Sequence, residues 1–464
     1  MSATTRAIRP SCVDPRSWTR GQSCSPATRH SLSHQIAGVG NVIFSFDTDT
    51  YSKIDTITFD TATIDPANAR FTSWGSNGLA IASDESIIAS GSFAGVEPSG
   101  PAPMFSPSAT GSTNSTIGSV SYSIFNIGAN NVVANPCTGE FYVATTGIAT
   151  YGTAIAWPNS VLSIDPGTNT LTGNIHAGSE PFSLGLSTDC SYLYVGLYNS
   201  NSVQRLTTAP LQADLLIPLH SATALNYAWE LDVAPGSPQT IAVAPNRLGP
   251  LPYLDDSSCG GLFAPEVIYD GAPPRPNLLG PSNAPPLQIV WGDSASIVYG
   301  TDVNDLVNDQ SVLSSWAVDS AGFESRTAIL SPPSVGYFFH YDRVHGRLFD
   351  SFLDVLNLHS SPATAATISS TWTAGGDSCN EPLQAMSTDS NGAALYAYTA
   401  PLGQINANLS VDVYEPNALA LTNHWGIPNP ITFDYPWKVA YLPNSVAIVM
   451  RSGQLVIFSG AVGH

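Results

Sequence analysis

The stretch GSEPFSLGLSTDCSYLYVGLYNSNSVQRL, residues 178–206, decides the fold of this chain. It contains an apolar run, a turn of Ser, Thr and Asp, a second apolar run, and a polar turn before a third run. Alternating apolar residues on both sides of such turns are typical of antiparallel β-hairpins. The preceding stretch SVLSIDPGTNTLTGNI, residues 160–175, is organised in the same way, with Asp, Gly and Asn at its turn. These residues predict short antiparallel strands.

The hairpin signal recurs along the chain roughly every 50 residues, which indicates an internal repeat. Eight copies begin at Gly78, Asn131, Phe182, Glu230, Leu287, Phe338, Leu383 and Lys438. Four antiparallel strands repeated at about this spacing are typical of a β-propeller. We therefore predict an all-β fold, a closed β-propeller of seven or eight four-stranded blades. An N-terminal strand from 41–59 or from 118–127 would complete the last blade and close the ring.

The runs at 178–206 and 160–175 resemble the YVTN-type repeats of bacterial surface β-propellers, whose blades are also similar to those of propeller lactonases. The resemblance spans roughly residues 118–460. It implies seven blades, and it specifies blade architecture, not activity. The predicted domains are a disordered or leader segment over 1–36 and a propeller over 37–464.

The composition limits the partners and the location. Fifteen Lys and Arg against 35 Asp and Glu give a net charge of -20, which argues against a nucleic-acid partner. No apolar run approaches the roughly 18 residues that a membrane helix needs. The Arg-rich start lacks the apolar core of a signal peptide. The Ser-, Thr- and Asn-rich, Lys-poor body still favours a secreted or cell-surface protein, which we expect to be a monomer.

Six cysteines are present, and none forms a CxxC pair, so neither a zinc ribbon nor a thioredoxin-type site is indicated. Cys137 and Cys190 occupy the same place in successive repeats. Equivalent positions in neighbouring blades usually lie farther apart than a disulfide can span, about 7 Å between Cα atoms. We therefore predict no bridge between these two cysteines.

Familiar catalytic patterns are absent, because the chain has no GxSxG, HExxH, Walker loop or strand-associated GxGxxG. The leading hypothesis is consequently a propeller that binds a small-molecule ligand or a protein partner at the mouth of its central channel. A fold alone does not confer an activity.

One position just before the first strand of each repeat could lie at the mouth of the channel. The residues there are Asn77, Asn131, Glu180, Glu230, Gln288, His340, Glu381 and Lys438. Radial symmetry would bring their side chains toward a common axis, and carboxylate and amide oxygens are the ligands that Ca²⁺ prefers. The predicted metal is Ca²⁺ or another divalent cation, and its predicted ligands are Glu180, Glu230, Glu381, Asn131 and Asn77. The alternative is that these acids cap strands or bind channel water.

The second hypothesis is a Ca²⁺-dependent lactonase or esterase at the central channel, as the resemblance to propeller lactonases implies. Its predicted catalytic residues are Glu230 and His340, one of which would take a proton from water. His340 and Asp342 share a strand face and could pair as base and orienting carboxylate, or could belong to an ordinary polar hairpin. Lys438 would weaken cation binding if it faces the channel.

Overall fold

The fold is taken from a computed structural model of the chain. The structure describes the strands within residues 30–89 and, farther along, residues 113–117, 119–147, 157–198, 200–219, 226–247, 267–279, 286–305, 310–330, 339–350, 354–359, 364–367, 384–400, 408–415, 417–428 and 434–460. The chain divides into two compact units, residues 1–99 and residues 100–464. The predicted domain boundary at 36/37 lies outside the described residues.

The first unit contains two small antiparallel sheets. One is formed by β1 (His30–Ser31), β2 (Asn41–Asp47) and β3 (Lys53–Phe59), and the other by β4 (Leu79–Ile81) and β5 (Ile87–Ala89). The repeat copy that begins at Gly78 is therefore the β4–β5 hairpin. It pairs with no blade sheet in the described part of the chain.

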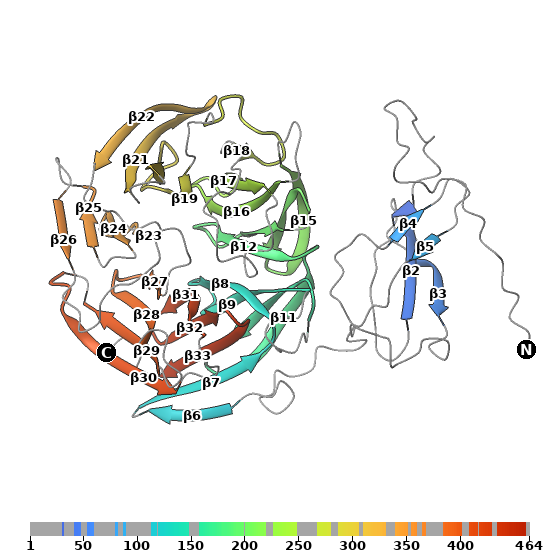
Figure 1. The fold of residues 1–464 in the computed structure, drawn as a ribbon, viewed down its shortest axis with the longest axis horizontal. Coiled ribbons are helices and arrows are strands. Elements are labelled where there is room, and N and C mark those ends of the chain that lie inside the picture. Colours follow the sequence, from blue (N-terminus) through green and yellow to red (C-terminus); the bar gives the residue numbers. More distant parts are fainter. Residues whose placement is uncertain are drawn as a thin grey trace, which may run out of the picture. The chain divides into compact units, whose positions relative to one another are not determined.

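The second unit is a ring of seven blades (Figure 1). Blade 1 contains β8 (Ala129–Asn135), β9 (Glu140–Thr145), β10 (Ser160–Asp165) and β11 (Thr170–His176). Blade 2 contains β12 (Pro181–Leu186), β13 (Tyr192–Leu197), β14 (Ser202–Thr208) and β15 (Leu211–Pro218). Blade 3 contains β16 (Asn226–Val233), β17 (Thr240–Arg247) and β18 (Val267–Asp270), extended by a bridge from Tyr269 to Pro274.

The other blades follow in sequence order. Blade 4 contains β19 (Pro286–Trp291), β20 (Ile297–Asp305), β21 (Gln310–Asp319) and β22 (Gly322–Leu330). Blade 5 contains β23 (Phe339–Asp342), β24 (Arg347–Asp350), β25 (Asp354–Asn357) and β26 (Thr364–Thr367). Blade 6 contains β27 (Gln384–Thr388), β28 (Ala394–Ala400), β29 (Asn408–Tyr414) and β30 (Leu421–Pro428). Blade 7 contains β31 (Pro436–Leu442), β32 (Ser445–Met450) and β33 (Gln454–Gly460).

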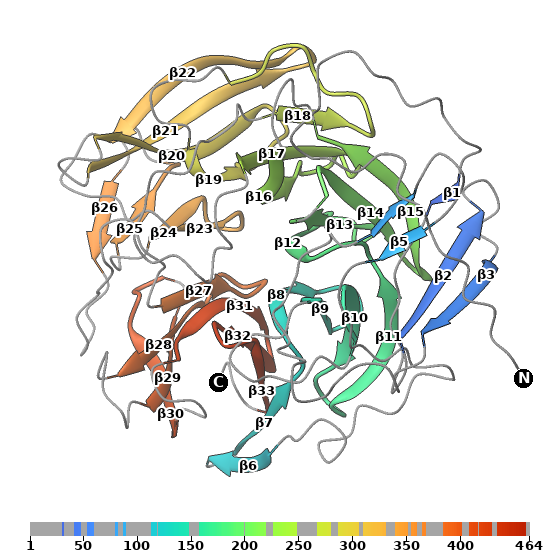
Figure 2. The same ribbon diagram turned by 45° about the vertical axis from the view of Figure 1, so that its right-hand side comes forward.

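An N-terminal strand closes the ring. The strand β7 (Val120–Asn126) pairs antiparallel with β33 and supplies the fourth strand of blade 7, and β6 (Thr113–Ile117) pairs with its outer edge (Figure 2). This closure confirms the second of the two predicted closing segments. It joins the two ends of the propeller by a ladder of backbone hydrogen bonds, with β6 as the outer edge of this sheet.

The hydrophobic core lies between neighbouring blades. Phe125 of blade 7 and Phe141 of blade 1 are fully buried in one cluster with Leu455 and Ile457, across the junction at which the ring closes. Burial of one such side chain stabilises the fold by about 1.5–3 kcal/mol. The alternating apolar residues of the repeats therefore hold each blade to the next.

The inner strand, the first strand of a blade, begins with a register shift in five blades. These shifts lie between Ala129 and Asn131, Pro181 and Leu184, Ala228 and Glu230, Pro286 and Ile289, and Pro436 and Lys438. A bulge or similar irregularity interrupts the alternation of side chains between the two faces of a strand. The side chains of residues beside these shifts therefore point in directions that differ from those in a regular strand.

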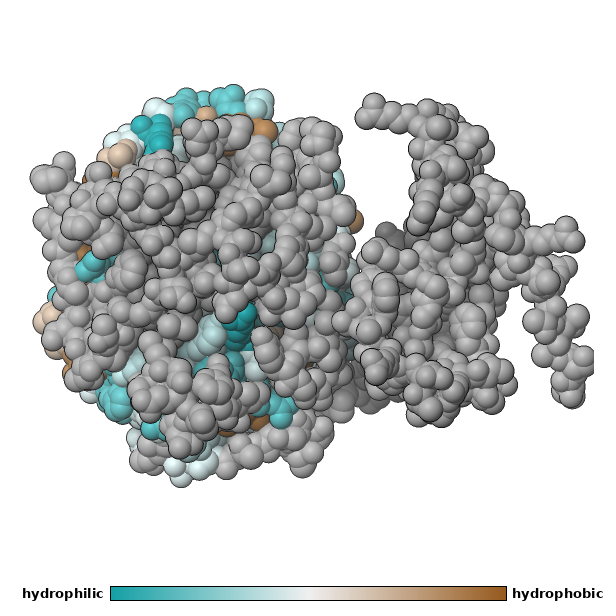
Figure 3. All heavy atoms as spheres, viewed as in Figure 1, coloured by the Kyte–Doolittle hydropathy of each residue, from teal (hydrophilic) through white to brown (hydrophobic). Residues whose placement is uncertain are grey.

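The regular structure of the described residues is entirely β-strand. No helix among them is long and apolar enough to cross a membrane. Single exposed apolar residues are scattered over the described surface in Figure 3, where the visible residues are otherwise largely hydrophilic. The large hydrophobic side chains with the greatest exposure are Leu216, Val344 and Leu421, on three different blades.

Candidate functional site

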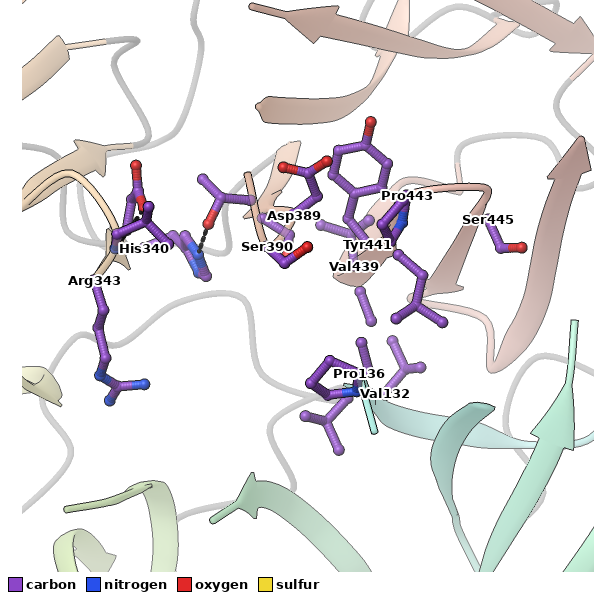
Figure 4. A pocket seen from close by; sticks show the side chains of 18 of the residues that line it. Val132, Pro136, His340, Arg343, Asp389, Ser390, Val439, Tyr441, Pro443 and Ser445 are labelled. Atoms are coloured by element: carbon purple, nitrogen blue, oxygen red, sulfur yellow. Dashed lines mark hydrogen bonds between the residues drawn. The ribbon is translucent and has the colours of Figure 1, made fainter. Parts of the chain in front are cut away.

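A pocket of about 620 Å³ opens among the inner strands of blades 1, 5, 6 and 7 (Figure 4). Its walls are formed by residues of β8, β23, β27 and β31, by Leu184 of β12 and Ser445 of β32, and by the A–B turns, the turns that join the first and second strands of a blade. Val132, Pro136, Val439 and Pro443 supply apolar wall, and Ser390 supplies a hydroxyl group. We call this cavity the A–B pocket. Its volume lies in the usual range for small-molecule sites.

Arg343, in the A–B turn of blade 5, carries the cationic group among the described residues that line the pocket. Its Nη2 donates to Oδ2 of Asp232 on β16 at 2.5 Å, which joins blade 5 to blade 3. Asp232 also accepts hydrogen bonds from the backbone N–H groups of Val233 and Trp291. Burial raises the pKa of Asp232, and the nearby Arg343 opposes that rise. The ion pair therefore links the inner strands of blades 3 and 5 with blade 4 between them.

His340 lies half-buried on β23 and lines the same pocket. Its Nε2 lies 2.9 Å from the hydroxyl group of Thr388 on β27. Burial lowers the pKa of His340 to about 4, with Asp342 opposing the shift and Arg343 adding to it. The imidazole is therefore neutral at physiological pH, and it can accept as well as donate a hydrogen bond.

The two carboxylates that line the pocket already accept hydrogen bonds from groups in or beside their own turns. Asp342 is 1% exposed, and its Oδ2 accepts from His345 at 2.9 Å and from Arg347 at 3.1 Å. Asp389 is also buried. It accepts hydrogen bonds from backbone N–H groups of its own A–B turn, among them that of Ala393. His340 and Asp342 therefore have different partners, as in the polar hairpin that was one of the two interpretations of this segment.

Asn131 and Glu180 connect blades 1 and 2. Asn131 Nδ2 donates to the carbonyl oxygen of Phe182 at 2.9 Å. Glu180 accepts from Thr146 Oγ1 at 2.5 Å and from the backbone N–H of Gly147 at 2.9 Å. Burial raises the pKa of Glu180 to about 7, and these two hydrogen bonds limit the rise. Both side chains thus bind the neighbouring blade.

Glu230 and Lys438 form a contact between blades 3 and 7, because Lys438 Nζ donates to Glu230 Oε1 at 2.6 Å. Trp229 and Trp437, the residues just before them, pack with ring centroids 6.4 Å apart. The side chains of Glu230 and Lys438 are 15% and 25% exposed. Glu230 is therefore paired with the ammonium group of Lys438. The sequence analysis expected such a lysine to weaken cation binding.

The predicted calcium ring is only partly described. Asn77 and Glu381 lie outside the described residues. Asn131, Glu180 and Glu230 are each bonded to a protein group, and no group of three or more His, Cys, Asp or Glu residues suited to a metal ion occurs in the described part of the chain. The described donors do not fit a preformed Ca²⁺ site, and the metal assignment stays a prediction.

The prediction about the cysteines is wrong. Cys137 and Cys190 form a disulfide, with their Cα atoms 6.4 Å apart. The two residues lie in the A–B turns of blades 1 and 2, next to inner strands that are already joined by the Asn131–Phe182 hydrogen bond. The predicted spacing applies to blades in general. Near the channel, inner strands of neighbouring blades converge, so a disulfide can span the gap.

The sequence analysis also missed the A–B pocket, although one signal was present. Val344 is an apolar residue in an A–B turn and is 59% exposed, whereas Pro136 and Pro443 are ordinary turn residues. Turns separated by hundreds of residues meet only when the ring is closed. The signal was therefore one exposed valine, which does not say which turns share a wall with it.

Comparisons with known proteins place the fold only. No known protein family matches the sequence, and no curated protein matches it. Among solved structures, hydrazine synthase of Kuenenia stuttgartiensis is 11% identical, with a TM-score of 0.50, and the match covers 72% of this chain and 96% of that chain. The β-propeller domain of Cps50 (Swd1) from Myceliophteria thermophila is 10% identical, with a TM-score of 0.47 and coverages of 72% and 96%. At 11% identity, the likeness to hydrazine synthase concerns the fold alone.

Proposed function

We propose that this chain is an extracytoplasmic β-propeller that binds a small-molecule ligand or a protein partner at the A–B pocket. The observation that carries the proposal is the pocket of about 620 Å³, whose apolar wall carries Arg343, neutral His340 and the hydroxyl group of Ser390. An apolar cavity with a few convergent polar groups is the common form of a ligand site.

The proposed location is supported by the disulfide between Cys137 and Cys190. Disulfides form and persist in oxidising compartments and are rare in the cytosol of most organisms. The YVTN-type resemblance of residues 178–206 points in the same direction. The location can be tested by fractionating the source cells and detecting the native chain with an antibody. Recovery of all the protein from the cytosol, with both thiols free, would contradict it.

A ligand screen with a blocked pocket tests the binding function. Ser390→Trp should fill the A–B pocket, and Leu216→Trp on β15 of blade 2 is the control, because Leu216 is 55% exposed and lies on an outer strand. Ligands found by thermal shift with the wild-type protein should lose affinity in Ser390→Trp and keep it in Leu216→Trp. The same pair of variants serves in a pull-down for a protein partner. Equal binding by both variants would place the site elsewhere.

A Ca²⁺-dependent lactonase remains the second candidate. The observation in its favour is His340, a neutral imidazole in the pocket wall that could accept a proton from water. Its test is hydrolysis of a lactone panel with EDTA and with added Ca²⁺, for the wild type and Glu230→Gln. Activity that is lost with chelator, restored by Ca²⁺ and absent in Glu230→Gln would favour this candidate over a binding protein. Absence of hydrolysis by the Ca²⁺-loaded protein would remove it.

A further inference from the structure

Arg343 has donors that its ion pair leaves unused. Its Nη2 is bonded to Asp232, and its Nε is buried with no hydrogen-bond partner among the described residues. The buried Nε is closed to a ligand, but the guanidinium group has five N–H donors and the Arg343 side chain is 33% exposed, so its exposed N–H groups can take an acceptor from the pocket. Asp232 does not supply it, because its two oxygens are already shared by Arg343 and the backbone N–H groups of Val233 and Trp291.

The other charges around the pocket do not compete for this role. The carboxyl groups of Asp342 and Asp389 are buried and hydrogen-bonded within or beside their own turns. Figure 4 shows Asp389 beside Tyr441, on the opposite side of His340 from Arg343. His340 is neutral. Among the described lining residues, Arg343 is thus the charged residue that can offer N–H donors to a ligand while Nη2 stays bonded to Asp232.

The rest of the wall facing Arg343 is apolar. Val132 and Pro136 come from blade 1, and Val439 and Pro443 come from blade 7. In Figure 4 these four side chains lie together on one side of the cavity, and Arg343 lies on the other. A ligand that satisfies both sides has an acidic group at one end and an apolar body at the other.

We propose that the A–B pocket binds a small apolar carboxylic acid. Its carboxylate would lie on Arg343, and its hydrocarbon body would pack against the wall formed by the side chains of Val132, Pro136, Val439 and Pro443. This inference rests on the proposed ligand-binding function and names the ligand class. Charge-assisted hydrogen bonds from a guanidinium group to a carboxylate are among the stronger ones in proteins, and the planar fork selects carboxylates. Asp232 opposes such a ligand by its own charge, and therefore tunes its affinity.

The test is titration of the full-length protein with benzoate, hexanoate and the matched amides, benzamide and hexanamide, followed by calorimetry or ligand-observed NMR. The wild type should bind the acids at millimolar concentration or below, and bind them more tightly than the amides. Arg343→Gln should weaken binding of the acids by about tenfold and leave the amides within about twofold. Arg326→Gln is the matched control, because Arg326 lies on the outer strand β22.

A second variant separates loss of charge from loss of structure. Asp232→Asn removes the competing carboxylate, so it should tighten binding of the acids by a few-fold, whereas a merely damaged pocket would bind less. Both variants are first compared with the wild type by circular dichroism and thermal unfolding. Acetate and inorganic phosphate are measured as well, because equal binding of these small anions would overturn the role of the apolar wall.

The outcomes distinguish the inference from the proposed function. If no acid binds at millimolar concentration, or if the acids bind equally well to Arg343→Gln, the inference is overturned. A neutral ligand that binds the wild type and is blocked by Ser390→Trp would then still uphold the A–B pocket as the binding site. If Ser390→Trp changes the binding of no ligand at all, the proposed function fails with it.

Discussion

Arg343 and Asp232 are 111 residues apart in the sequence and lie 2.5 Å apart between Nη2 and Oδ2. They belong to blades 5 and 3, and Asp232 also accepts a hydrogen bond from Trp291 of blade 4. Three blades are therefore joined at the channel by one carboxylate. The arrangement makes the pocket wall depend on the integrity of the ring.

Removal of Arg343 should destabilise the propeller. Arg343→Met leaves Asp232 buried without its counterion, and loss of one partner of a buried pair costs about 3–5 kcal/mol. We expect about 2 kcal/mol here, because the Arg343 side chain is 33% exposed. Urea unfolding measures the change. The double variant Asp232→Asn/Arg343→Met should recover part of the loss, and a single variant as stable as the wild type would show that the pair contributes nothing.

Glu180 should make stability fall as the pH rises. Its pKa is about 7 in the fold against an ordinary value of 4.5, so the neutral form is favoured by folding. The stabilisation is fully present below about pH 4.5 and is lost as the pH rises through about 7. A shift of this size corresponds to about 3 kcal/mol. Glu180→Gln should therefore be more stable than the wild type at pH 8.5 and similar to it at pH 4.5.

The same chemical unfolding, run at both pH values, checks this prediction. Asp165→Asn is a suitable control, because Asp165 is half-buried at the end of β10 and bonds Gly167 and Thr168 of the following turn. If the wild type and Glu180→Gln show the same difference in stability at both pH values, the carboxyl group of Glu180 does not titrate in the predicted range.

The disulfide between Cys137 and Cys190 should stabilise the fold measurably. The two cysteines are 53 residues apart, and closing a loop of this length removes about 4 kcal/mol of chain entropy from the unfolded state. Cys137→Ser/Cys190→Ser should therefore unfold at lower urea concentration than the wild type. Peptide mapping without reductant should recover the two residues in one linked fragment. Alkylation of both thiols in the native protein without prior reduction would contradict the bridge.

The contact between Glu230 and Lys438 should couple blades 3 and 7. Both side chains are mostly buried, so Lys438→Met should leave Glu230 unpaired and destabilise the protein by about 1–3 kcal/mol. In a double-mutant cycle with Glu230→Gln, the coupling energy should exceed about 1 kcal/mol. A coupling energy near zero would show that the two groups are independent in solution.

The repeats predicted the blades well because each blade is a local structure. Strand–turn–strand patterns such as 178–206 lie within one blade, and their alternation is directly visible in the sequence. The anchor at Gly78 was ambiguous for the same reason, because a hairpin signal does not say which sheet the hairpin joins. Only ring closure by β7 separates seven blades from eight.

The arrangement of the site was harder to predict. Asn131, Glu230 and Lys438 each lie at a register shift at the start of an inner strand, and such an irregularity redirects a side chain from the direction that regular alternation gives. The sequence placed these residues just before their strands. Asn131, Glu230 and Lys438 instead lie within β8, β16 and β31, whereas Glu180 does precede β12, so the aligned residues do not occupy one equivalent position. The A–B pocket combines turns from distant blades, so no local pattern encodes it.

The most direct test of the central claim is hydrogen–deuterium exchange of the wild-type protein with and without a ligand from the screen. The account predicts that bound ligand slows exchange in the A–B turns of blades 1, 5, 6 and 7, that is, near residues 136–139, 343–346, 389–393 and 443–444, which border the pocket. The turns between the two outer strands of blades 2 and 4, residues 209–210 and 320–321, serve as internal controls. Protection confined to the outer strands, or to the opposite ends of the inner strands, would contradict the claim that the A–B pocket is the binding site.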